Sequence, residues 1–277
     1  MVLSTLTFSM LSAGIKYLRD FPTFQLIFFR GLGSLFLATY FLKRAQISLR
    51  GNSPKWLLIR AFCGLISMGL FFASLNYLPL GAAVPLRYVA PIFATFFAVY
   101  LLKETVYRLQ ILFIGIAFVG ILILKGFDSQ LSGIGFGIIL SSAFFSGLVY
   151  IIIRKIGKSE HPLVIVNYFM AVSTLVGLIF ALPQWVWPQD WTTWVLLGSL
   201  GVFGFVGQLY MTRAFQIAAT NKIAPLKYLE GIFALLLGWF WFEETYSIYT
   251  LSGVGLILIG LTLNTTYKPL SKGRPLR

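Results

Sequence analysis

Four ionisable residues lie inside apolar stretches that are long enough to cross a lipid bilayer. They are Arg30, Arg87, Lys227 and Glu230. A charge near the centre of a membrane helix costs about 2.5–3.5 kcal/mol on insertion scales, so such residues normally face a partner or a polar cavity. Three cations and one carboxylate leave a net charge of +2. This balance favours a solute that carries a carboxylate or a phosphate, including a zwitterion.

Arg87 and Lys227 are the strongest candidates for substrate binding, because the short sequences around them are duplicated. The two tetrapeptides are Pro85–Tyr88 and Pro225–Tyr228. A proline removes a backbone donor and frees the carbonyl four residues earlier. Interrupted helices at matching positions of two halves are a recognised mark of the binding site in secondary transporters. The pattern predicts that both cations line a cavity near the membrane midplane.

Four uncharged polar residues complete the candidate site: Tyr88, Tyr228, Asn167 and Gln208. The tyrosines either stack on or hydrogen-bond a substrate, or anchor their helices at the interface. Asn167 and Gln208 either line the cavity or join neighbouring helices through a hydrogen bond.

Structural interpretations of the charged residues stay open beside the functional ones. Arg87 and Lys227 are close enough to a helix end to extend toward the interface. Glu230 is either a proton-coupling carboxylate or the i+3 salt-bridge partner of Lys227. Arg30 either lines the cavity or braces the carbonyls of adjacent helices.

The residue inventory argues against an enzyme. No apolar segment holds an aspartate, and the single His161 and single Cys63 exclude a multi-histidine metal centre and an internal disulfide. A glycine-rich loop of the Walker type is absent from the sequence, so ATP is not the direct energy source. We expect no cofactor and no metal.

The composition requires a lipid environment. Of the 277 residues, 58% are hydrophobic and 11% are charged, and the mean hydropathy is +0.86. A soluble domain carries about 25% charged residues. The net charge of +14 does not predict nucleic-acid binding, because the cations lie between apolar segments and not along one amphipathic stripe.

The apolar stretches predict ten membrane-spanning helices, since about 20 apolar residues cross the hydrocarbon core. The ten stretches are Val2–Leu18, Phe24–Leu42, Trp56–Tyr77, Gly81–Leu102, Tyr107–Leu124, Ile134–Ile153, Leu163–Leu182, Trp191–Met211, Ile223–Phe242 and Ile248–Thr266.

The loop charges predict the orientation of these helices. Sixteen cations, Arg60 among them, are assigned to one side, and only Lys16, Arg19 and Lys125 to the other. Cytoplasmic loops of membrane proteins are enriched in Lys and Arg. We therefore expect an inner-membrane protein with both termini in the cytoplasm.

The chain also contains an internal repeat with an offset of 140 residues. The stretch PLRYVAPIFATFFAVYLLKET from Pro85 aligns without gaps with PLKYLEGIFALLLGWFWFEET from Pro225, and 8 of 21 positions are identical. Glycines at 64, 115 and 120 match glycines at 204, 255 and 260. Five spans in each copy reverse the direction of the second copy. The expected domains are an inverted pair of five-helix repeats, residues 1–126 and 132–267, followed by a basic cytoplasmic tail, 268–277.

These paired segments, together with the FFRG motif at Phe28–Gly31, resemble the EamA branch of the drug/metabolite transporter superfamily. The resemblance covers nearly the whole chain. It implies ten helices around a central cavity, with four helices of each half lining the cavity and the fifth packed outside. Members of this family carry amino acids, nucleotide precursors, cofactors and drugs.

The sequence therefore predicts an all-α membrane protein that acts as a secondary active transporter by alternating access. Its expected partners are the lipid bilayer and a small polar metabolite, anionic or zwitterionic, such as an amino acid or a cofactor-like molecule of the S-adenosylmethionine type. Proton coupling through Glu230 is one interpretation of the site. The alternative functions are a channel and a non-transporting membrane scaffold.

Overall fold

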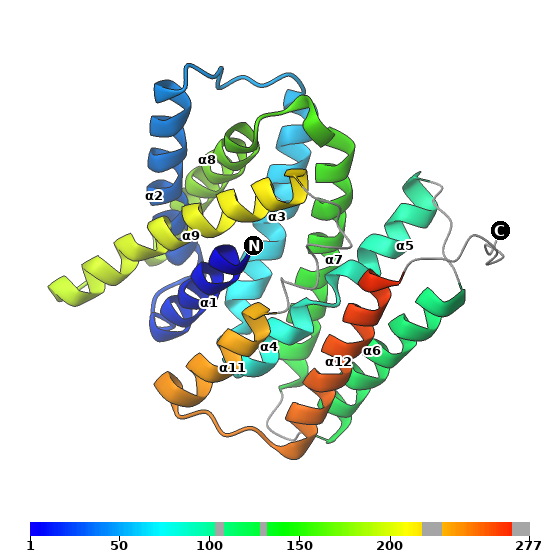
Figure 1. Cartoon of the computed structure of the whole chain (residues 1–277). Coiled ribbons are helices and arrows are strands. Elements are labelled where there is room, and N and C mark those ends of the chain that lie inside the picture. The colour runs from blue at the N-terminus through cyan, green and yellow to red at the C-terminus, as the bar shows by residue number, and fades with distance from the viewer. Residues whose placement is uncertain (103–107, 128–131, 218–228, 268–277) are drawn as a thin grey trace.

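The structure is a computed structural model, and it describes residues 1–102, 108–127, 132–217 and 229–267. Within these ranges every regular element is a helix (Figure 1). The first group of helices is α1 (Val2–Tyr17), α2 (Thr23–Arg44), α3 (Pro54–Ser74), α4 (Leu80–Arg87), α5 (Ala90–Leu102) and α6 (Arg108–Phe127). The second group is α7 (Gly133–Ile156), α8 (Pro162–Ala181), α9 (Trp191–Ile217), α11 (Leu229–Phe242) and α12 (Ile248–Thr266), with short 3₁₀ turns η1 (Gly157–Ser159) and η2 (Leu182–Gln184).

Five of the described helices are long and apolar enough to cross a membrane: α2, α3, α7, α8 with its η2 extension, and α9. Shorter apolar helices cover 80–94, 112–123, 229–242 and 248–264. Many large apolar side chains on these helices are exposed on the outside of the bundle, as expected where lipid is the solvent. The chain is an all-helical, multi-pass membrane protein.

Helix starts follow from local sequence signals. Pro54 and Pro162 occupy the first turns of α3 and α8, where the missing backbone donor has no cost. Ser247 caps α12 by accepting a hydrogen bond from the backbone N–H of Thr250 at 3.1 Å. These signals place the helix ends near the predicted limits of the spans.

The fourth predicted span differs from the prediction, because it is two helices and not one. The break lies at Tyr88 and Val89, between α4 and α5. Pro91 has no N–H to donate to the carbonyl of Arg87, four residues earlier, so the helical hydrogen-bond pattern is interrupted at this point. The interruption places the end of α4 inside the helix bundle.

Helix packing brings distant segments of the chain together. Helix α2 packs against α8 and α9, α3 against α7 and α8, and α1 against α9 and α11. Helices α6 and α12 lie side by side at one edge of the molecule (Figure 1). Gly33 of α2 faces Gly201 of α9 so closely that a Cβ on Gly33 would lie 2.8 Å from the Gly201 Cα. This contact allows the two backbones to approach each other.

Candidate functional site

A cavity lined by both charged and apolar side chains lies within the bundle where eight helices meet. Its lining residues come from α1, α2, α3 and α4 and from α7, α8, α9 and α11. Among the described residues, α6 and α12 supply none of the lining. The cavity has a volume of about 80 Å³, which is room for several water molecules.

Three arginines and one glutamate give the cavity its charge. Arg30 comes from α2, Arg60 from α3, Arg87 from the last turn of α4 and Glu230 from the first turn of α11. Arg30, Arg60 and Glu230 are 5%, 2% and 1% exposed. Arg30 interacts electrostatically with the other three residues, so these charges form one cluster.

Phenylalanine rings hold the guanidinium groups in place. The Cζ atom of Arg87 lies 4.2 Å from the ring centroid of Phe71, and that of Arg60 lies 4.3 Å from the ring centroid of Phe169. Arginine over an aromatic face is stabilised by the quadrupole of the ring. Such stacking leaves the N–H edges of a guanidinium available for acceptors.

The predicted uncharged site residues take different places. Gln208 of α9 lines the cavity and is 4% exposed, and its Nε2 has no hydrogen-bond partner among the described residues. Asn167 of α8 donates a hydrogen bond from Nδ2 to Thr39 Oγ1 of α2 at 2.8 Å. Tyr88 is buried at the end of α4 and packs against Gly231. Neither Asn167 nor Tyr88 is among the lining residues.

Two of the predicted site residues, Lys227 and Tyr228, lie outside the described residues. The structure therefore brings together Arg30, Arg87, Gln208 and Glu230 from the predicted set.

The sequence interpretation missed Arg60, which it had counted with the loop cations. The structure places Arg60 in the second turn of α3, buried and facing the cavity. The signal was present in the sequence, because the predicted span from Trp56 to Tyr77 already contains this residue.

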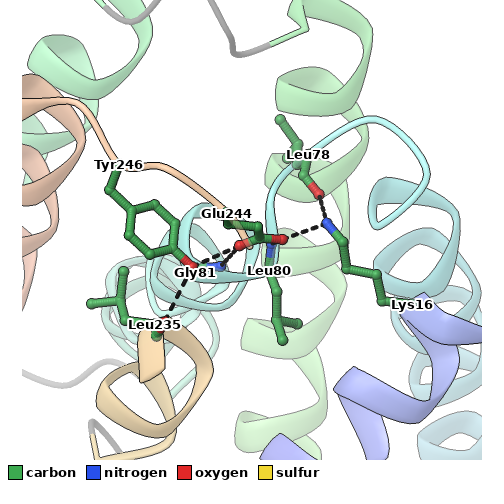
Figure 2. A network of polar contacts seen from close by, with 7 residues as sticks. All are labelled: Lys16, Leu78, Leu80, Gly81, Leu235, Glu244 and Tyr246. Carbon is green, nitrogen blue, oxygen red and sulfur yellow. Dashed lines mark hydrogen bonds and ion pairs between the residues drawn. The ribbon is translucent and has the colours of Figure 1, made fainter. Parts of the chain in front are cut away.

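A second polar network, shown in Figure 2, is centred on Glu244 and shares no residue with the lining of the cavity. Lys16 Nζ, at the end of α1, is 2.6 Å from Glu244 Oε1, in the connection between α11 and α12. Glu244 also accepts hydrogen bonds from the backbone N–H groups of Leu80 and Gly81, at 2.8 and 3.3 Å, and from the Tyr246 hydroxyl at 2.6 Å. A carboxylate at a helix N-terminus, here that of α4, is favoured by the helix dipole. One carboxylate thus ties three helix ends together.

These contacts set the ionisation of Glu244. Burial alone would raise the pKa of Glu244, but the hydrogen bonds from Lys16, Tyr246 and the Leu80 N–H outweigh it and hold the pKa below its ordinary value. Burial and the bond to Glu244 raise the pKa of the Tyr246 hydroxyl. Glu244 is therefore a carboxylate at neutral pH, and Tyr246 donates to it.

The opposite end of the bundle is held by a different glutamate. Glu160, just before α8, accepts a hydrogen bond from the backbone N–H of Asn52 at 2.6 Å. Asn52 Nδ2 donates to the Ser159 carbonyl at 2.6 Å, and Tyr168 donates to the Arg50 carbonyl at 2.7 Å. These contacts join two loops that the charge pattern assigns to the same, cation-rich side.

In the part of the chain that the structure describes, no three His, Cys, Asp or Glu side chains cluster at a distance suited to a metal ion. The charged groups at the cavity are three guanidinium groups and one carboxylate.

Comparison with protein families gives a match to the EamA-like transporter family over residues 1–125 and 133–266. The chain belongs to this family. The matched stretches cover both groups of helices that line the cavity, and they confirm the resemblance found in the sequence.

Several curated relatives of this EamA-like protein are named as transporters. The chain is 28% identical over 270 residues to the pseudopaline exporter of Pseudomonas aeruginosa, covering 96% of this chain and 95% of that protein. It is 26% identical over 225 residues to the riboflavin transporter of Vibrio cholerae, covering 80% of this chain and 74% of that one. It is 24% identical over 270 residues to human solute carrier family 35 member G1, covering 91% and 74% of the two chains.

The fold of this EamA-like chain is also found in a crystal structure. That structure has a TM-score of 0.68 and 18% sequence identity, and the match covers 96% of this chain and 93% of the other. At this identity the likeness concerns the fold alone.

Proposed function

We propose that this protein is a secondary carrier that moves a small anionic or zwitterionic metabolite across the inner membrane by alternating access. The observation that carries the proposal is the cavity itself. Its wall brings three arginines, a glutamate and an amide into the centre of an apolar bundle. Buried charges of this kind in a membrane protein mark solute pathways.

Helix neighbours support an arrangement of two inverted five-helix halves. We match α1 to α7, α2 to α8 and α3 to α9. The contact between α3 and α7 then has its equivalent in the contact between α9 and α1. The contact between α2 and α9 has its equivalent in the contact between α8 and α3. Each of the contacts α2–α8 and α6–α12 joins a helix to its own counterpart. Gly120 and Gly260, at equivalent positions of the repeat, both lie where α6 contacts α12. A Cβ added to either glycine would lie within 3 Å of the backbone of the other helix. The two stretches matched by the family lie close to the proposed domains, 1–126 and 132–267.

Alternating access requires that one end of the cavity is closed while the other opens. The network around Glu244 supports a closed state at the cation-poor end, because it joins α1, α4 and the α11–α12 connection. By the charge pattern this end faces away from the cytoplasm, and both termini are cytoplasmic.

The names of the relatives support a metabolite-sized solute, since one is an exporter of pseudopaline and another a transporter of riboflavin. Amino acids and cofactor-like molecules fit this range. Under this proposal Glu230, buried at the cavity wall, is the residue positioned to couple transport to protons.

Counterflow in proteoliposomes tests the proposal. Vesicles containing the purified protein are loaded with one metabolite of a panel, and uptake of the labelled form is measured with and without a proton gradient. A carrier gives saturable counterflow. Flux that never saturates would instead support a channel, and the absence of flux for every metabolite would support a scaffold.

A further inference from the structure

Arg60 is the least exposed of the three cavity arginines, and two of its donors have no partner. Its Nε and Nη1 find no acceptor among the described residues, although the side chain is only 2% exposed. Buried polar groups in proteins are nearly always hydrogen-bonded, and leaving a charged donor unpaired is costly. These two donors are suited to an acceptor that does not belong to the protein.

Two other donors in the same cavity share this property. Gln208 Nε2 and Arg30 Nε are buried and have no hydrogen-bond partner in the described part of the chain. The contact made by Arg30 Nη1 is with the sulfur of Met68, which is a weak acceptor. Donors from α2, α3 and α9 therefore meet at one cavity with few acceptors from the protein.

The charge of the cavity wall fixes what kind of acceptor is needed. The described lining contains the guanidinium groups of Arg30, Arg60 and Arg87 and one carboxylate, that of Glu230. Two positive charges are left without a balancing carboxylate on the wall. Buried charges are stable only when they are paired, and guanidinium groups bind carboxylate and phosphate groups through two parallel N–H bonds. Two acidic groups on a solute would supply the missing acceptors for these guanidinium groups.

Glu230 adds a further requirement. Its carboxylate is 1% exposed and is the only acidic group that the described lining presents to a solute. An ammonium group placed near it would be attracted, whereas a third acidic group would be repelled. The wall thus matches two acidic groups on the arginine side and one amine on the Glu230 side.

We propose that the cavity selects an amine-bearing solute with two acidic groups, and that Arg60 and Gln208 together hold one of these groups. The inference rests on the carrier function proposed above, and it narrows the solute to a class. Arg60 is then a determinant of specificity that distinguishes a diacid from its neutral amide.

Binding to the purified full-length protein tests the class directly. The probes are glutamate, O-phosphoserine and glutamine, and the measurement is the concentration dependence of thermal stabilisation in detergent. Glutamate and glutamine have nearly the same shape and differ by one negative charge. We expect glutamate, O-phosphoserine or both to bind at least about tenfold more tightly than glutamine, because a hydrogen bond from arginine to a charged acceptor is stronger than one to a neutral amide. The two acidic probes distinguish a carboxylate from a phosphate as the second acidic group.

Substitutions at Arg60 test its role. Arg60→Gln is expected to weaken binding of the acidic probe about 10- to 100-fold and to leave glutamine binding nearly unchanged. Arg60→Lys keeps the charge but lacks the planar guanidinium group, so it should weaken binding of the acidic probe to an intermediate extent. It provides the test if Arg60→Gln does not insert into the membrane. Arg44→Gln is the matched control, because Arg44 is an exposed arginine at the end of α2.

The outcomes separate this inference from the carrier function. Equal binding of glutamate and glutamine, or no binding of any probe, overturns the proposed solute class. An unchanged preference in both Arg60 variants overturns the role of Arg60. Counterflow of neutral solutes alone overturns it as well but leaves the carrier function in place. Binding of an acidic probe that depends on Arg60, without counterflow of that probe, supports the solute class and counts against the carrier.

Discussion

Lys16 Nζ lies 2.6 Å from Glu244 Oε1, and this ion pair joins the end of α1 to the connection between α11 and α12 (Figure 2). The same carboxylate accepts hydrogen bonds from the first backbone N–H groups of α4. In the proposed mechanism the pair is a closed latch, because the helices that it joins would have to separate for the cavity to open at this end.

Breaking the latch should expose the cavity at the cation-poor end. In a Cys63→Ser background, Ser12→Cys places a thiol on the cavity wall. Adding Glu244→Gln should raise the rate at which an impermeant maleimide labels this thiol roughly tenfold, because an interaction worth about 1.5–3 kcal/mol is lost in the closed state. Labelling of intact cells and of inverted vesicles shows which face has opened.

Glu243→Gln, one residue earlier and exposed, should leave the rate of labelling unchanged. An equal rise in both variants would contradict the latch.

The latch should also respond to pH. The pKa of Glu244 is below its ordinary value of 4.5 in the folded protein, so the interaction stabilises the protein at pH above 4.5. That stabilisation is lost as the pH falls through 4.5 toward the lower folded value. We expect Glu244→Gln to lower the melting temperature at pH 7 and to have a progressively smaller effect below pH 4.5. A difference in melting temperature that is constant between pH 7 and pH 4 would exclude this role for the carboxylate.

Sequence reasoning identified much of the cavity, because charge in an apolar span is rare. Arg30, Arg87 and Glu230 were predicted from this property, and Gln208 from its polar side chain within a span. All four line the cavity, and their role in substrate binding stays a prediction. Arg60 was missed because a cation close to a span end looks like a loop residue when charges are counted by side. Only the packing of α3 against α7 and α8 shows that this turn of the helix is enclosed.

The sequence alone could not predict which distant residues pair with each other. The charge pattern assigned Lys16 to the cation-poor side of the membrane, but it could not identify Glu244 as its partner. Their contact depends on how α1 packs beside α11 and α4, and many residues on one face satisfy the same pattern. The break at Tyr88 was signalled by prolines, yet the burial of Tyr88 against Gly231 depends on the packing of α4 on α11.

The close contact between α2 and α9 makes a prediction about stability. A Cβ on Gly201 would lie 2.6 Å from the Cα of Gly33, whereas a Cβ on Gly198 meets nothing within 4 Å. Gly201→Ala should therefore destabilise the protein by about 1–3 kcal/mol, the usual cost of overpacking. Gly198→Ala should be neutral or slightly stabilising, since alanine has the higher helix propensity. Melting temperatures of the two purified variants provide the comparison, and equal values would show that the two backbones do not need this approach.

Arg87 and Lys227, at equivalent positions of the repeat, give the most direct prediction about transport. Arg87 stacks on Phe71 within the cavity wall. Arg87→Ala removes a positive charge that a solute would otherwise contact. We expect it to lower counterflow about 10- to 100-fold, as the loss of a charge-assisted contact does. Lys227→Ala should have a similar effect if the repeat brings both cations to the solute.

Arg44→Ala is the control for these two variants, because Arg44 is exposed. Membrane insertion, measured by the amount of protein in the membrane fraction, should be unchanged in every variant. Full transport by the Arg87→Ala, Lys227→Ala double variant would remove both residues from the site, because no cation at these two equivalent positions would then be needed to bind the solute.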